Sequence, residues 1–81
     1  MKVRVKFYAQ LLDLTGMRQM EVDLPEDATV RNLIETLYSQ QPALRCHDKS
    51  ILIGAGVEFV DRNYKLTAGE EIAIMPPVQG G

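Results

Sequence analysis

The last six residues of the chain, rather than a cluster of polar side chains, are the group best suited to chemistry. They are two prolines, two further residues and two glycines: Pro76, Pro77, Val78, Gln79, Gly80 and Gly81. Two adjacent prolines supply no backbone N–H donors and fix φ, so they stop a strand and favour an extended, polyproline-like path. At about 3.3 Å per extended residue, such a tail reaches up to about 20 Å, deep enough to enter the active site of a partner.

The two glycines make the carboxylate of Gly81 the expected reactive group. Gly80 and Gly81 have no side chains, so they suit a narrow channel and leave the terminal carbonyl open to attack. A terminal carboxylate is ionised at neutral pH, because its reference pKa is about 3.5, and an anion is a poor electrophile until ATP converts it into a mixed anhydride. We therefore expect the chain to bind no cofactor and a separate protein to use ATP for the activation.

The whole chain has the size and composition of one small globular domain. It holds 81 residues, of which 46% are hydrophobic and 25% charged, and its formal net charge is -2. A chain of this size has little room for an enclosed cavity, so we expect any active site to be shared with a partner. Its negative charge makes nucleic acid an unsuitable partner, since binding there depends on clustered cations that meet phosphates.

The sequence also indicates a soluble protein of the reducing cytoplasm. Cys46 is the only cysteine, so no intramolecular disulfide can form, and the N-terminus shows no apolar run with a cleavage pattern. No apolar stretch approaches the roughly 20 residues that are needed to cross a bilayer. We therefore expect no contact with a membrane.

Two strand patterns and a short helical pattern occupy the first part of the chain. Apolar and polar residues alternate over residues 2–8 and again over residues 19–24, which predicts two strands that each bury one face. Between them, residues 9–15 predict one or two helical turns that end at Gly16 in the left-handed region.

The main helix is predicted over residues 29–41. Thr29 is placed to cap it, Asn32 replaces the glutamate of a full capping box so that the cap is expected to be partial, and Pro42 ends it before a polar loop. An apolar stripe at spacings of three and four predicts the face of this helix that packs on the core: Val30, Leu33, Ile34 and Leu37.

The second part of the chain predicts two or three strands. Residues 51–53 and 58–60 are short apolar runs on either side of the expected turn Gly54-Ala55-Gly56, and residues 70–75 alternate again. This order of elements predicts an α+β fold, with a mixed sheet of four to five strands and one main helix packed across it. Right-handed crossover favours parallel pairing of the first and last strands. We expect a domain over residues 1–75 and an extended tail over residues 76–81.

Several other groups of residues have plainer explanations than catalysis. Adjacent residues in a loop, such as Cys46-His47, rarely orient toward each other, and one histidine with one cysteine provides no metal-ligand spacing. Neighbours on a strand point to opposite faces, so Glu70-Glu71 predicts solvated charge rather than a carboxylate pair. The glycines of Gly54-Ala55-Gly56 lack the third glycine and the helix of a dinucleotide site. A basic stripe on the first strand predicts a wet sheet face: Lys2, Arg4 and Lys6.

Over its whole length the chain resembles the ubiquitin-like β-grasp proteins and, among them, the small, sulfur-carrying subunit of molybdopterin synthase. Three blocks carry the resemblance, and the last of them is the most specific: Val5-Lys6-Phe7-Tyr8-Ala9-Gln10, then Thr29-Val30 with Leu33, and Leu66-Thr67-Ala68-Gly69-Glu70-Glu71-Ile72 followed by the terminal Pro76-Pro77-Val78-Gln79-Gly80-Gly81. Sulfur carriers of the thiamine pathway share the fold and the final glycine pair but usually lack the Pro-Pro-Val before it. One departure is Gly56, which stands where the family commonly has asparagine.

The resemblance implies a thiocarboxylate on Gly81. A ubiquitin-activating-like enzyme adenylates the terminal carboxylate, and a persulfide sulfur replaces the adenylate. Pro76 to Gly80 then enter a channel of the large catalytic subunit, which holds most of the active site. There the sulfur passes to a cyclic pyranopterin monophosphate precursor and builds the dithiolene of molybdopterin. The resemblance further implies a heterotetramer of small and large subunits.

The resemblance also implies an apolar surface for the partner, made by Tyr8, Phe59 and Met75. Alternation places Tyr8 and Met75 on the outward side of the first and last strands, whereas it leaves Phe59 undecided. Scattered exposed apolar residues are also normal on a protein surface.

Three other functions stay open at this point. A thiamine-type sulfur carrier uses the same terminal glycines. A ubiquitin-like modifier uses the same activated carboxylate to form an amide on target lysines. A noncatalytic binding module would carry its glycine tail incidentally.

Overall fold

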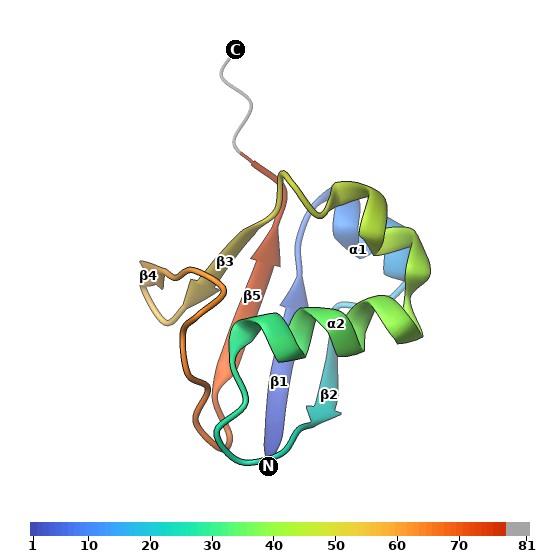
Figure 1. Ribbon diagram of the computed structural model, residues 1–81. Coiled ribbons are helices and arrows are strands. Elements are labelled where there is room, and N and C mark those ends of the chain that lie inside the picture. The colour runs from blue at the N-terminus through green and yellow to red at the C-terminus, as the bar shows by residue number, and fades with distance from the viewer. Residues whose placement is uncertain (78–81) are drawn as a thin grey trace.

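Residues 1–77 of the computed structural model form a five-stranded sheet with helices on one side, and residues 78–81 lie outside the part that the structure describes (Figure 1). The strand order is β2-β1-β5-β3-β4. The bounds are Lys2–Phe7 for β1, Gln19–Asp23 for β2, Leu52–Ala55 for β3, Glu58–Phe59 for β4 and Glu71–Met75 for β5. No helix in residues 1–77 is long and apolar enough to span a membrane.

The centre of the sheet is the parallel pair of β1 and β5, as the sequence predicts. Val5 lies opposite Ile72 and Phe7 opposite Ile74 in this pair. β2 pairs with β1, β3 with β5 and β4 with β3, all antiparallel. The C-terminal strand is therefore flanked by strands on both sides.

The helices follow the predicted positions, with two corrections. The short helix α1 spans Gln10–Thr15 and ends at Gly16, whose φ of 73° is left-handed. The main helix α2 spans Val30–Gln40, and Asn32 completes its capping box, because its Oδ1 accepts the N–H of Thr29 at 2.8 Å. The expectation of a partial cap was therefore wrong, since the amide oxygen of asparagine reaches the same donor as a glutamate does. The expected loop after α2 was also wrong, because a 3₁₀ helix, η1, spans Pro42–His47.

The turn between β3 and β4 is shorter than predicted. Gly54 and Ala55 belong to β3, and the reversal occurs at Gly56-Val57. Gly56 has a φ of 65°, a conformation that glycine and asparagine both adopt readily, so glycine at this position is compatible with the turn. Gly54 has a different role, because a Cβ there would lie 3.3 Å from Cε of Met75.

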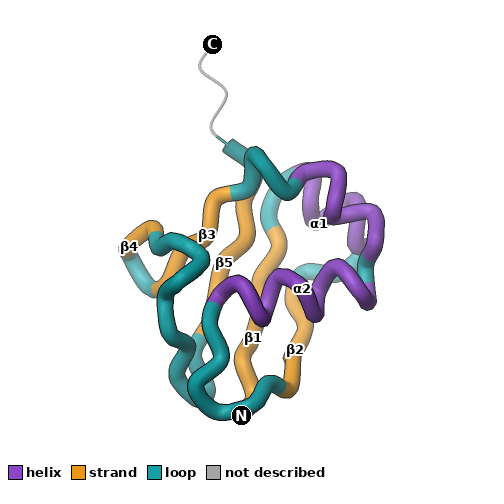
Figure 2. The backbone as a smooth tube through the Cα atoms, in the orientation of Figure 1, coloured by secondary structure: helices purple, strands orange, loops and turns teal. Residues whose placement is uncertain are grey.

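The core lies between α2 and one face of the sheet (Figure 2). The predicted stripe of α2 is buried, and so is the inward set of β1 and β5: Val30, Leu33, Ile34, Leu37, Val3, Val5, Phe7, Ile72 and Ile74. At about 1.5 to 3 kcal/mol for each buried aliphatic side chain, this layer is the main stabilising contribution to the fold. The opposite face of the sheet is covered by neither α1 nor α2, so it is available to a partner.

Candidate functional site

The residues predicted to bind a partner share the sheet face that points away from α2. Along β5, Ile72 and Ile74 are buried against the helix, so Met75 points to the other side. Tyr8 follows β1 directly, and its N–H donates to the carbonyl of Ile74 at 3.3 Å, which places it beside the end of β5. Tyr8 is 44% exposed. The alternation argument for Tyr8 and Met75 therefore agrees with the geometry.

Phe59 belongs to the same face, which alternation alone could not decide. Phe59 lies opposite Gly54, and Gly54 lies opposite Ala73, which is on the outward side of β5. Its side chain is 68% exposed. A large aromatic group held this far out of the core is a candidate contact for another protein.

Leu52 is a further member that the sequence did not indicate. It lies opposite Met75 in the β3–β5 pairing and is half-buried. Its position in the apolar run 51–53 gave no alternation from which to read its face. We refer to the group formed by Tyr8, Leu52, Phe59, Ala73 and Met75 as the apolar patch.

Charged side chains continue the same face beside the apolar patch. Lys6 Nζ lies 3.2 Å from Oε1 of Glu71, and Arg4 Nη1 lies 3.9 Å from its Oε2. All three side chains are well exposed, so each pair contributes less than about 1 kcal/mol to stability. The basic stripe is therefore a solvated sheet face that is partly neutralised by Glu71.

Glu70 supports the turn before β5 rather than forming a carboxylate pair with Glu71. Its carboxylate accepts the hydroxyl of Tyr64 and, at 2.9 Å, the N–H of Thr67. The hydrogen bond to Glu70 raises the pKa of the Tyr64 hydroxyl. The expectation of solvated charge is therefore correct for Glu71, which is exposed on β5, but wrong for Glu70, which precedes the strand and is held by these hydrogen bonds. Within residues 1–77, no group of three or more acidic, histidine or cysteine side chains is arranged to hold a metal ion.

The C-terminal segment begins at the end of the apolar patch. β5 ends at Met75, Pro76 is half-buried and Pro77 is exposed. The other predicted tail residues, Val78, Gln79, Gly80 and Gly81, which is predicted to carry the reactive carboxylate, lie outside the described residues. The division at residues 75 and 76 and the roles of these residues stay predictions.

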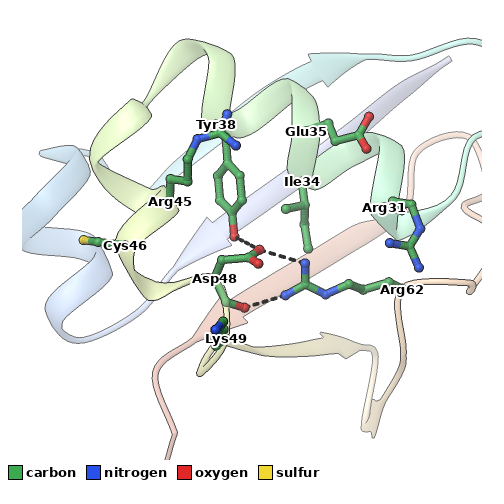
Figure 3. Close-up of a pocket in the computed structure, with 9 residues that line it drawn as sticks. All are labelled: Arg31, Ile34, Glu35, Tyr38, Arg45, Cys46, Asp48, Lys49 and Arg62. Carbon is green, nitrogen blue, oxygen red and sulfur yellow. Dashed lines mark hydrogen bonds and ion pairs between the residues drawn. The ribbon is translucent and has the colours of Figure 1, made fainter.

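A polar network on the helix side of the molecule was missed by the sequence analysis (Figure 3). Asp48 Oδ1 accepts the hydroxyl of Tyr38 at 2.6 Å and Nη1 of Arg62 at 2.7 Å, and Nη2 of Arg62 donates to the carbonyl of Asp48 at 2.6 Å. Arg45 lies over the ring of Tyr38, with 5.2 Å between the guanidinium carbon and the ring centroid. The network joins α2 to the residue after η1 and to the segment after β4. Cys46 lies beside it, exposed, with its Sγ 3.0 Å from the carbonyl of Ala43.

This network shifts three pKa values in the directions that stabilise it. Two effects raise the pKa of Tyr38 well above its usual value: its burial, which is the larger effect, and its hydrogen bond to Asp48. The hydrogen bonds from Tyr38 and then Arg62 lower the pKa of Asp48. The hydrogen bond to Asp48 raises the pKa of Arg62. At neutral pH the three groups are therefore a neutral phenol, a carboxylate and a guanidinium.

These shifts predict a loss of stability at both ends of the pH scale. The raised pKa of Tyr38 stabilises the fold fully below its unfolded value of about 10, and this contribution decreases as pH rises further. The lowered pKa of Asp48 stabilises the fold above its unfolded value of about 3.9 and is lost as pH falls. Urea unfolding of the wild type and Tyr38→Phe should differ by about 1 to 2 kcal/mol at pH 7 and by less at pH 11. An equal difference at both pH values would contradict the assignment.

Comparison with known proteins places the whole arrangement in one family. The model of the ThiS family matches residues 5–81, which include the second half of β1, all of α2 and β5, and the terminal glycines. This chain belongs to the ThiS family. The match begins inside β1 and extends to the last residue of the sequence.

Two kinds of name occur among the relatives of this ThiS family chain. A molybdopterin synthase sulfur carrier subunit from Escherichia coli (strain K12) is 35% identical over 83 residues, covering 98% of this chain and 99% of the relative. Small archaeal modifier protein 1 from Haloferax volcanii is 34% identical over 88 residues, covering 94% of this chain and 97% of the relative. The crystal structure of that modifier, SAMP1, is similar with a TM-score of 0.87 at 28% identity and covers 100% of both chains. The predicted ubiquitin-like β-grasp fold is thereby confirmed.

Proposed function

We propose that this chain is the sulfur carrier subunit of a molybdopterin synthase and that the carboxylate of Gly81 becomes a thiocarboxylate. The observation that carries the proposal is the family match through Gly81, together with a 35% identical relative of that name and nearly equal length. The resemblance of the terminal Pro-Pro-Val-Gln-Gly-Gly supports the same function. The open sheet face beside Pro76 and Pro77 provides a surface that holds the carrier while its terminus reacts.

In the proposed chemistry, the terminal carboxylate is converted into a thiocarboxylate that carries the sulfur. An adenylating enzyme transfers AMP from ATP to the carboxylate of Gly81, and pyrophosphate leaves. A persulfide displaces AMP, and a thiol cleaves the resulting acyl disulfide to leave the thiocarboxylate. Its sulfur anion is a soft nucleophile and is suited to transfer where water is excluded. Without side chains, Gly80 and Gly81 offer the least steric hindrance to each of these steps.

The partner in the proposed transfer is the large catalytic subunit, which the apolar patch would contact. Tyr8, Phe59 and Met75 lie on one face, and β5 leads from that face into Pro76. A subunit that covers the patch is therefore in position to receive the terminus. We infer that it contributes most of the active site, that the substrate is a cyclic pyranopterin monophosphate precursor, and that the two subunits form a heterotetramer.

Intact-mass spectrometry tests the carrier function directly. The chain is incubated with its adenylating enzyme, ATP and a sulfur donor, and its mass should rise by the difference between sulfur and oxygen. A matched reaction without ATP should leave the mass unchanged. No mass change in the complete reaction would count against the proposed function.

Protein modification is the second candidate, because small archaeal modifier protein 1 is 34% identical over nearly the same length. In that case the activated carboxylate of Gly81 ends as an amide on target lysines. Conjugates that persist on a denaturing gel with reducing agent would favour the modifier, whereas a free thiocarboxylate would favour the carrier. A thiamine-type carrier would also form the thiocarboxylate, so sulfur transfer to the pterin precursor distinguishes it.

Phe59→Ala is expected to weaken binding to the large subunit by about 10- to 100-fold. The ring is exposed in the free chain, and buried aromatic residues at interfaces often contribute about 2 kcal/mol or more. Isothermal titration calorimetry measures the dissociation constant. Val57→Ala is the matched control, because Val57 is a fully exposed apolar residue of the neighbouring turn. Equal affinity of both variants and the wild type would remove Phe59 from the interface.

A further inference from the structure

Four of the nine Lys and Arg residues of the chain line one hollow beside α2 (Figure 3). The hollow has a volume of about 440 Å³, and its cations come from α2, from η1 and the residues after it, and from the segment after β4: Arg31, Arg45, Lys49 and Arg62. Two carboxylates, Glu35 and Asp48, also line it. The cations outnumber the carboxylates although the whole chain has a net charge of -2, so positive charge is concentrated here.

Among the described residues, only one of the four cations in the hollow forms an ion pair within the domain. Asp48 pairs with Arg62, as described above. Within residues 1–77, no ion pair includes Arg31, Arg45 or Lys49, and all three residues are exposed. The ring of Tyr38 holds Arg45 at the edge of the hollow. Arg31, Arg45 and Lys49 are therefore available to an external anion, whereas Arg62 is paired with Asp48 and fixes one side of the hollow.

A second hollow adjoins the first and extends toward the apolar patch. It has a volume of about 430 Å³ and shares Arg31 and Arg62 with the first hollow. Its other lining residues are mostly apolar and include one carboxylate and one amide: Ile51, Leu52, Ile53, Phe59, Val60, Asp61 and Asn63. A chain segment that crosses both hollows would thus meet an apolar groove beside Phe59 and then a cluster of cations.

The groups around the hollows favour carboxylates on a peptide over a bound phosphate. Phosphate sites commonly use free backbone N–H groups at a helix N-terminus. In the first turn of α2, three backbone N–H groups already donate to backbone carbonyls: Val30 to Tyr64, Arg31 to Arg62, and Leu33 to Thr29. The donors that remain are side-chain cations on separate elements of the fold. Because they are spread along the hollow, they suit several carboxylates along a peptide segment better than one phosphate.

We propose that these two hollows bind an acidic segment of the large subunit. Carboxylates of that segment pair with Arg31, Arg45 and Lys49, while an apolar side chain lies in the groove beside Phe59. The inference rests on the proposed function, because Phe59 joins this surface to the apolar patch that the large subunit would cover. The large subunit then holds the domain on the sheet face and around the β4 edge, and the carrier enters the complex in one orientation.

Charge reversal tests the acidic segment without altering the terminal chemistry. Arg31→Glu and Lys49→Glu should each weaken binding to the purified large subunit by about tenfold at low salt, with a smaller effect at high salt. Arg31→Glu should fold normally, because an acidic residue in the first turn of a helix is favourable. Lys65→Glu is the matched control, since Lys65 is exposed and lies outside both hollows. Calorimetry at two salt concentrations provides the dissociation constants.

Two results would overturn the inference. One is an affinity for the large subunit that neither reversal changes by more than twofold relative to Lys65→Glu. The other is saturable binding of inorganic phosphate in the first hollow, seen in an NMR titration of the wild type, while the charge-reversal variants bind the large subunit as tightly as the wild type does. The mass of the thiocarboxylated chain is measured separately. If the chain accepts sulfur but the charge reversals leave its affinity for the large subunit unchanged, this inference is refuted and the proposed function is not.

Discussion

Removal of Gly81 is expected to reduce sulfur transfer to the background level, a loss of at least about a thousandfold. Under the proposed function the terminal carboxylate reacts in two active sites, those of the adenylating enzyme and of the large subunit. The shortened chain ends at Gly80, so its carboxylate would lie one residue, about 3.3 Å, short of both. A misplacement of about 1 Å already costs about 100-fold in rate when a reaction depends on orientation. Single-turnover formation of the dithiolene product with the large subunit measures the loss, and intact mass measures the first step.

The stability of the shortened chain provides the control for this prediction. Among residues 1–77, the core lies between α2 and the sheet and includes no residue after Ile74. We therefore expect removal of Gly81 to leave the urea midpoint unchanged. Gly81→Ala keeps the length of the tail and should retain part of the activity, because only a methyl group is added. Full transfer by the chain that lacks Gly81 would refute the assigned role of this residue.

Arg62→Ala is expected to destabilise the domain by about 2 kcal/mol, the largest stability effect that we predict for a single side chain outside the core. The substitution removes the two hydrogen bonds to Asp48 and leaves its carboxylate with Tyr38 as its remaining partner in the network. Asp48 is 40% exposed, so water replaces part of the lost interaction and limits the cost. For a domain of this size, we expect the melting temperature to fall by about 10 °C.

The matched control for Arg62→Ala is Arg18→Ala. Arg18 is exposed and forms no side-chain hydrogen bond or ion pair within residues 1–77. Thermal unfolding followed by circular dichroism should therefore show little change for this variant. If both arginine variants lower the melting temperature equally, the network with Asp48 and Tyr38 contributes nothing specific to the fold.

The parts of the fold that the sequence predicted are those with strong local patterns. β1 and β5 alternate clearly, α2 has an apolar stripe between Thr29 and Pro42, and Gly16 marks the end of α1. Each of these signals depends on neighbours within a few positions of the chain. The 3₁₀ helix η1 has no such periodic signal, and Pro42, which starts it, was interpreted only as the end of α2.

The candidate site shows the same division between local and distant information. Tyr8 and Met75 could be placed on the outward face by alternation, but Phe59 and Leu52 required the register of β3 with β4 and β5. The pairing of Asp48 with Arg62 joins residues 14 positions apart, and no pattern in the sequence links them. The charged hollow beside α2 therefore became visible only when α2, η1 and the segment after β4 were placed together.

The parallel pairing of β1 and β5 determines how the domain responds to a mechanical load. β1 starts at the N-terminal end of the chain, and β5 runs beside it in the same direction to Met75, so the free ends of the two strands lie at opposite ends of the sheet (Figure 1). A force on Pro77 that is resisted at Lys2 therefore acts in shear along the evenly spaced hydrogen bonds of the pair. These bonds are loaded together rather than unzipped one after another, so the β1–β5 pair should resist this pull more strongly than a pair loaded from one end.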